Sequence, residues 1–252
     1  MLRKNPYFCL FMTTMNIPCD IPVEKLPFMM GGLCLQEPMA LITNWIIASV
    51  AFVLYYKLRP LSGDFVKNWR FFLISIGLST FFGGLGHIFF QYTGFYGKIP
   101  SWVLGNLAAF FAGKAMISTF LLKQSTNSFL LRLLYFKFLF FTFLALYYES
   151  FTFVLIDTAI TYFLFCLGYG LYYWRRKGYA SFKHMIIGVI ILISSAFTFV
   201  FEINLSLWLN KDDLSHLIIA TTIIFFYISI KRYSEYNMAM PLGERQQHVD
   251  EK

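Results

Sequence analysis

The stretch NKDDLSHLIIATTIIFFYISI, residues 210–230, decides the fold. From residue 213 to residue 230 it is an apolar run long enough to cross a bilayer as a helix. Asp212, Asp213 and His216 stand at the start of this run. Charged and titratable groups in or beside hydrocarbon are costly, so they usually have a partner or a function. The stretch therefore predicts both a membrane-spanning helix and a polar site at its mouth.

The composition agrees with a membrane protein. Of the 252 residues, 58% are hydrophobic and only 13% are charged. A soluble domain of this length would leave too much apolar surface in water, so we expect an all-α integral membrane protein. The net charge of +8 arises from Lys and Arg in short loops between apolar runs. That pattern indicates membrane orientation, and we expect no nucleic-acid partner.

Seven apolar segments of spanning length predict a seven-transmembrane-helix bundle. The segments are residues 38–58, 68–91, 101–122, 129–148, 151–174, 184–208 and 213–230. The predicted organisation has three parts. They are an extracytoplasmic segment (1–36), the seven-helix domain (37–232) and a cytoplasmic tail (233–252) that is polar enough to be disordered.

Lys and Arg are concentrated in the loops after the first, third and fifth segments and at the start of the tail. The loops on the other side hold only Lys98 and Lys211. This bias predicts an amino terminus outside and a carboxyl terminus in the cytoplasm. An exported amino-terminal segment permits one disulfide among Cys9, Cys19 and Cys34, and the sequence does not choose the pair.

With that orientation, most polar residues of the predicted helices fall in the outer half of the membrane. Random placement would not favour one leaflet, so we interpret them as one site. They are Glu37, Asn44, His87, Asn106, Asp157, Glu202, Asp212, Asp213 and His216.

Spacing in the last helix indicates metal chemistry. Asp212 lies four residues before His216 and Asp213 lies three before it, so either carboxylate can share a helix face with the imidazole. With His87 at the same depth, His87, Asp212 and His216 form a ligand set suited to zinc. A fourth position would remain open for an activated water. Asp213 would then be a neighbouring or proton-transfer group. The alternative is that the aspartates cap the helix and the histidines hydrogen-bond between helices.

Other polar residues have expected roles beside this site. Asn44 and Asn106 are expected to hydrogen-bond between helices, with Glu37 on the same helix face as Asn44. Lys114 lies deep in the third segment, so it must face the interior and be paired or neutral. Asp157 and Glu202 are the candidate partners by depth.

The pattern resembles the CREST superfamily, the alkaline ceramidases and the progestin-and-adipoQ receptors. The family's acidic residue with an Asn seven later matches Glu37 and Asn44, its helix 2 His matches His87, and the second His of its helix 7 pair matches His216. Asp212 replaces the first His of that pair, Gly83 replaces a Ser, and residues 88–100 contain no match to the family's Asp. The resemblance implies seven helices and a zinc-dependent lipid amidase or a related receptor.

Three functions follow as hypotheses. The leading one is a metal-dependent hydrolase acting on a membrane lipid amide or ester at the outer leaflet, with Asp213, Asp157 or Glu202 moving protons. The second is a seven-helix receptor or sensor that binds a ligand without turnover. The third is a proton- or ion-coupled carrier that uses Lys114, Asp157 and Glu202. The oligomeric state does not follow from the sequence.

Overall fold

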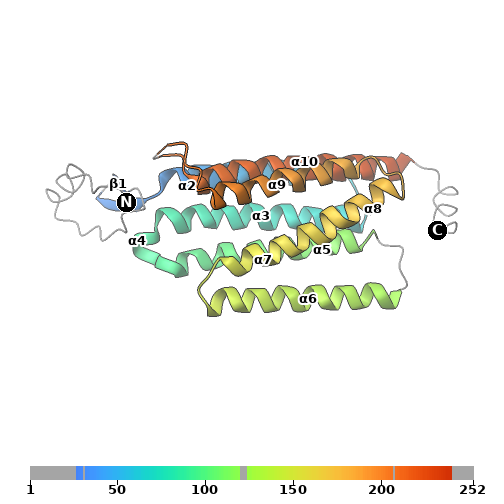
Figure 1. Cartoon of the computed structure of the whole chain (residues 1–252), viewed down its shortest axis with the longest axis horizontal. Coiled ribbons are helices and arrows are strands. Elements are labelled where there is room, and N and C mark those ends of the chain that lie inside the picture. Colours follow the sequence, from blue (N-terminus) through green and yellow to red (C-terminus); the bar gives the residue numbers. More distant parts are fainter. Residues whose placement is uncertain (1–26, 31, 120–123, 207, 240–252) are drawn as a thin grey trace.

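The computed structural model describes residues 27–30, 32–119, 124–206 and 208–239. Long helices run along one axis, and the amino-terminal hairpin and α4 lie at one end of the bundle (Figure 1). The carboxyl-terminal end of α10 lies at the opposite end. The expected all-helical class is therefore confirmed, with one short β-hairpin added to it.

The hairpin lies at the end of the bundle where the first helix begins. Strands β1 (Pro27–Met30) and β2 (Leu33–Gln36) pair antiparallel, with Phe28 opposite Leu35. The Cys34 backbone N–H donates to the Tyr92 hydroxyl at 2.9 Å, and the Gln36 amide donates to Gln91 at 3.1 Å. These bonds join β2 to α4 (Phe90–Thr93) and close this end of the molecule.

The first half of the chain forms three long helices that pack side by side in chain order, with two short helical segments between the second and the third. Helix α2 (Pro38–Lys57) packs on α3 (Asp64–Ile88), and α3 packs on α5 (Ile99–Ile117) after α4 and the 3₁₀ segment η1 (Gly94–Lys98). A Cβ added at Gly84 would lie 3.1 Å from Leu41 and 3.3 Å from Asn44. A side chain at this position would therefore crowd α2, and glycine lets α3 approach it closely.

The second half begins at the edge of the bundle. Helix α6 (Gln124–Tyr147) packs only on α5 and on α7 (Thr152–Thr161) among the described elements with several contacts. A π-helical segment, η2 (Tyr162–Tyr169), and α8 (Gly170–Arg175) continue α7 as one rod. Helices α9 (Phe182–Val200) and α10 (Lys211–Ala239) then complete the bundle beside α2.

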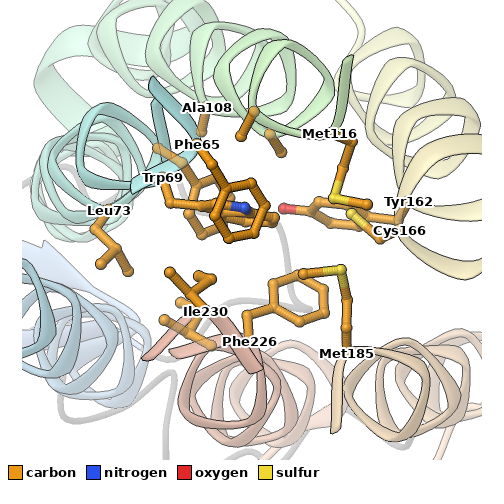
Figure 2. Packing of buried hydrophobic residues seen from close by; sticks show 14 of the residues in the cluster. Phe65, Trp69, Leu73, Ala108, Met116, Tyr162, Cys166, Met185, Phe226 and Ile230 are labelled. Carbon is orange, nitrogen blue, oxygen red and sulfur yellow. The ribbon is translucent and has the colours of Figure 1, made fainter. Parts of the chain in front are cut away.

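The apolar core fills the axis between these helices. Figure 2 shows side chains from several helices meeting there, including Trp69, Tyr162, Met185 and Phe226. The Trp69 and Phe226 rings meet edge to face at 5.6 Å, and Tyr162 meets Phe226 at 5.6 Å. Edge-to-face aromatic pairs add to the stabilisation from apolar burial, so this layer fixes how the helices sit around the axis.

Within the described residues, five helices are long and apolar enough to cross a membrane. They are Pro38–Lys57, Asp64–Ile88, Gln124–Tyr147, Thr152–Arg175 and Lys211–Ala239. Helix α9 contains a shorter apolar stretch, Phe182–Thr198, and α5 has 19 residues. All seven predicted segments are thus helical, five of them with the length and hydropathy of a span.

The largest differences from the predicted carboxyl-terminal ends are in α5, α9 and α10. Helix α9 ends at Val200 rather than 208, because Glu202 takes a left-handed conformation (φ 48°) and the Ile203 N–H bonds back to Thr198 at 2.9 Å. Helix α5 ends at Ile117 rather than 122. Helix α10 continues to Ala239, so the first residues of the predicted tail are helical.

Candidate functional site

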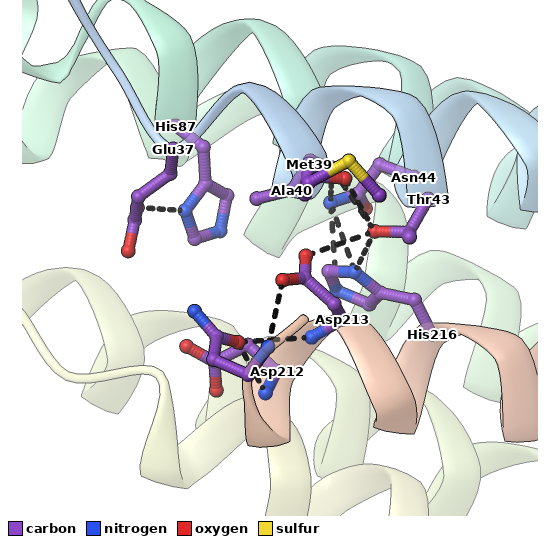
Figure 3. Close-up of polar contacts among 10 residues, drawn as sticks. Glu37, Met39, Ala40, Thr43, Asn44, His87, Asp212, Asp213 and His216 are labelled. Carbon is purple, nitrogen blue, oxygen red and sulfur yellow. Dashed lines mark hydrogen bonds and ion pairs between the residues drawn. The ribbon is translucent and has the colours of Figure 1, made fainter. Parts of the chain in front are cut away.

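Five of the predicted polar residues meet at the end of the bundle closed by the hairpin. They come from the start of α2, the end of α3 and the start of α10, as Figure 3 shows. They are Glu37, Asn44, His87, Asp213 and His216. We refer to these five residues, with Thr43, as the end cluster.

Glu37 and His87 form one half of the end cluster. The Glu37 carboxylate lies 2.7 Å from His87 Nδ1, with side-chain exposures of 10% and 20%. Glu37 precedes Pro38 and adopts a left-handed backbone (φ 48°, ψ 58°), a conformation that costs a non-glycine residue free energy. A carboxylate on Nδ1 holds the imidazole in the tautomer whose Nε2 carries the free lone pair.

His216, on the first turns of α10, forms the other half. Its Nδ1 lies 2.9 Å from the Thr43 hydroxyl, and both ring nitrogens lie 3.4 Å from the Asn44 amide nitrogen. Thr43 and Asn44 are almost fully buried on α2. The Thr43 hydroxyl is also within 2.9 Å of the Met39 carbonyl. The single Thr43 hydroxyl hydrogen thus has several possible acceptors. Whether His216 Nδ1 carries a hydrogen determines whether this nitrogen can be one of them.

Asp213, rather than Asp212, turns toward this imidazole. The Asp213 carboxylate is 1% exposed; Oδ1 lies 3.3 Å from Thr43 Oγ1, and Oδ2 accepts from the Asn210 N–H at 3.1 Å. The Asn210 side chain in turn accepts from the N–H groups of Asp212 and Asp213. Asn210 and Asp213 therefore form a capping box, which orients Asp213 inward and Asp212 away from Thr43 (Figure 3).

The helix capping expected as the alternative thus occurs together with the cluster. Among the described residues, the structure records no contact between the Asp212 carboxylate and either imidazole. The capping box turns Asp213 rather than Asp212 toward Thr43, and the expected role of Asp212 as a metal ligand beside His216 stays a prediction. Asp213 takes the inward position instead.

The two imidazoles face each other across the end cluster. Their ring centres are 6.5 Å apart and their planes meet at 79°. A histidine bonded to zinc at about 2.0–2.1 Å holds its ring centre about 3 Å from the ion, so two rings sharing an ion lie at most about 6 Å apart. The observed separation is just beyond that limit. In agreement, no three His, Cys, Asp or Glu side chains of the described segments are already gathered at metal-binding distances.

Gly83 of α3 lies at the wall of the end cluster. A Cβ at Gly83 would lie 3.3 Å from Asn44 Oδ1 and 3.0 Å from Ser101 Oγ. Position 83 therefore borders the cluster but supplies no hydroxyl to it. Ser79, one turn earlier, donates to the Ser101 carbonyl at 2.7 Å and joins α3 to α5.

Asp157 and Asn106 each make interior contacts apart from the end cluster. Asp157, fully buried on α7, pairs with Lys137 of α6, whose ammonium also donates to Thr161 at 2.9 Å. Asn106 donates to Thr142 at 3.0 Å and joins α5 to α6. Asp157 Oδ2 and Asn106 Oδ1 are buried without a hydrogen-bond partner among the described residues. Neither residue reaches the end cluster.

The expected partners of Lys114 were wrong. Asp157 pairs with Lys137 instead, and Glu202 is exposed in the loop after α9, with Lys211 at 3.6 Å. Because α5 ends at Ile117, Lys114 lies in its last turn, where the helix dipole favours a cation. Its Nζ lies 6.0 Å from the centre of the Phe110 ring.

Thr43 and Lys137 are the polar residues that sequence reasoning missed. Lys137 carried a usable signal, because it is a lysine inside the apolar run LLYFKFLFF (133–141). Thr43 carried none, since a threonine in an apolar helix usually bonds its own backbone, as Thr43 also does.

The fold and the end cluster define an all-helical protein with a histidine–carboxylate site at one end of its bundle. A family model described as a family of unknown function (DUF6962) matches residues 39–235, and the chain belongs to this family. The match contains the helical bundle and all of the end cluster except Glu37. No curated protein and no solved structure matches the chain.

Proposed function

We propose that the chain is an integral membrane protein with seven spans. Helices α5 and α9 add two crossings to the five long apolar helices, since 19 residues extend about 28 Å. The outward faces support a lipid environment. In α6 only 11% of the most apolar 18-residue stretch is buried. Phe136, Leu139 and Phe143 are each at least 60% exposed. Such a surface is unfavourable in water and ordinary in lipid.

In this proposal the hairpin end lies outside the cytoplasm. The Lys and Arg bias of the loops supports that orientation. Cys34 adds a second, independent support, because it is disulfide-bonded at the hairpin end and disulfides persist in oxidising compartments. Cys9 and Cys19, the other two cysteines of the predicted segment, lie outside the described residues.

The end cluster then lies at the outer membrane surface, and we propose that it is the site of a metal-dependent hydrolase acting on a lipid amide or ester. The observation that carries this proposal is His87, oriented on Nδ1 by Glu37 at 2.7 Å and facing His216. Histidine ligands of zinc are commonly held by a carboxylate on the other ring nitrogen.

His87 and His216 would hold the ion, and a small rotation of either side chain brings the rings within reach of it. A bound zinc ion supplies a water of lowered pKa and polarises a carbonyl. The Thr43 hydroxyl lies within hydrogen-bond distance of both the Asp213 carboxylate and His216 Nδ1. In this proposal the Asp213 carboxylate accepts a proton or completes the ligand set. Asp157 pairs with Lys137 and Glu202 lies near Lys211, so we do not assign to them the proton transfer first expected of them.

The test is metal content and lipid turnover of the purified full-length chain. We expect about one zinc per chain, loss of zinc in His87→Ala and His216→Ala, and release of fatty acid from a mixture of ceramides and phospholipids. His184→Ala is the matched control, since His184 contacts Arg232 at 3.1 Å away from the cluster. Folded His87→Ala and His216→Ala proteins with wild-type zinc content would refute the metal site.

The same experiment separates the hydrolase from the other two functions. Zinc bound at the cluster without turnover of any lipid would indicate a binding protein or receptor on this scaffold. A carrier relay through Lys114, Asp157 and Glu202 has no support, because these three side chains lie in different parts of the fold.

A further inference from the structure

A cavity of about 540 Å³ lies at the opposite end of the bundle from the end cluster, around the loop between α2 and α3. Three cationic side chains, Arg59, Lys67 and Arg70, line it together with a single carboxylate, Asp64. Tyr55, Leu61 and Phe71 form its apolar wall. The cavity thus combines a cationic excess with an apolar surface, and none of its residues takes part in the end cluster.

Arg70 is the best-held cation of this cavity. Its guanidinium lies 5.1 Å from the centre of the Tyr55 ring and donates to the Tyr55 hydroxyl at 3.4 Å. Its Nε–H is buried without an acceptor among the described residues. A guanidinium has five N–H donors, and the terminal N–H groups of Arg70 can donate to an anion in the cavity.

The backbone adds to this preference. The cavity includes Ser62 and Gly63, and Gly63 is the N-cap of the 25-residue helix α3. Gly63 has no side chain that could cap the helix, so no N-cap side chain competes with an anion for the first-turn N–H groups of α3. The amino-terminal end of a helix carries a partial positive charge that adds to the charge of Arg59, Lys67 and Arg70.

We propose that this cavity binds a phosphate group, with Arg70 as the central ligand and Arg59 and Lys67 as flanking cations. An arginine guanidinium donates to two phosphate oxygens at a time, and a cavity of about 540 Å³ has room for a phosphate group. The apolar wall favours a phosphate that carries an acyl chain. In the proposed topology this end is cytoplasmic, where anionic lipid headgroups are abundant.

The test compares phosphate sources on the full-length chain in detergent, with the midpoint of thermal unfolding as readout. Dioctanoyl phosphatidic acid is titrated against dioctanoyl phosphatidylcholine and against inorganic phosphate. We expect a saturable rise of the midpoint with phosphatidic acid and none with phosphatidylcholine. Arg70→Gln should weaken the apparent affinity about tenfold or more, because it removes charge-assisted hydrogen bonds.

A second variant, Arg59→Gln with Lys67→Gln, changes only exposed side chains and keeps the test valid if Arg70→Gln fails to fold. Arg175→Gln with Arg176→Gln is the control, since both are exposed cations outside the cavity. A saturable rise with inorganic phosphate alone would support the same site with a soluble ligand. Equal loss in the control, no loss in either cavity variant, or no rise with either phosphate source would overturn the proposal.

Discussion

The Glu37 carboxylate and the His87 imidazole, 50 residues apart in the chain, meet at 2.7 Å and join the turn before α2 to the end of α3. Glu37 holds a left-handed backbone to make this contact, although the following Pro38 disfavours helical conformations at its predecessor. A strained residue that persists at a histidine marks this pair as the centre of the end cluster.

Replacing Glu37 by glutamine should lower the free energy of unfolding by about 1–2 kcal/mol, because the bond to His87 loses its charged partner. Zinc content should fall as well, since the imidazole is no longer held in one tautomer. Glu149→Gln is the control: Glu149 has a similar left-handed backbone (φ 50°) but is exposed. Equal effects of the two substitutions would show that backbone strain, rather than the histidine contact, is responsible.

Asp213 and Asp212 should behave differently although they are adjacent. Asp213→Ala removes the capping box and the contact with Thr43, so we expect a loss of about 1–2 kcal/mol in unfolding free energy and a loss of zinc. Asp212→Ala should cost less than about 1 kcal/mol, the contribution of a carboxylate to the helix dipole. Chemical or thermal unfolding in detergent measures both, and a larger effect at Asp212 contradicts the inward role of Asp213.

Lys137 and Asp157 should be strongly coupled. Lys137→Met or Asp157→Leu alone leaves a buried group without its charged partner, so each should cost about 3–5 kcal/mol. Combining Lys137→Met with Asp157→Leu should recover part of this loss. Lys114→Met is the control and should change little, because Lys114 lies in the last turn of α5. Additive effects at 137 and 157 would exclude the ion pair as a stabilising unit.

Labelling from the two sides of the membrane should reveal the proposed orientation. In a background in which all four native cysteines are replaced by alanine, a single new cysteine at exposed Ala180 should react with an impermeant maleimide only after the membrane is permeabilised. A cysteine at exposed Glu149 should react in intact cells. The reverse pattern would place the hairpin end in the cytoplasm.

Hydropathy and length were enough to predict the seven helical segments, since an apolar run has few other stable forms. Helix ends were harder. Glu202 follows α9 in a left-handed conformation that a glutamate does not predict. Helix α5 ends early enough that Lys114 lies in its last turn. The hairpin β1–β2 was missed because its strands have only four residues each.

The candidate site was half predictable for a geometric reason. Residue counts along a helix give depth, so Glu37, His87, Asp213 and His216 could be placed at one end. They do not give the rotation of a helix or the identity of its neighbours. Asp157 therefore faces α6 and Lys137 rather than the end cluster, and Asp212 yields the inward position to Asp213.

Under the proposed topology, the Lys137–Asp157 pair has a consequence for insertion of the chain into a membrane. A lysine near the middle of a helix raises the cost of insertion by about 2.5–3.5 kcal/mol, and α6 carries Lys137 in that position. Its counter-charge, Asp157 on α7, is synthesised 20 residues later. Under the proposed topology, α6 and α7 should therefore leave the translocon together as a helical pair. A chain truncated before Asp157 should hold α6 less firmly in the bilayer than one that ends after α8.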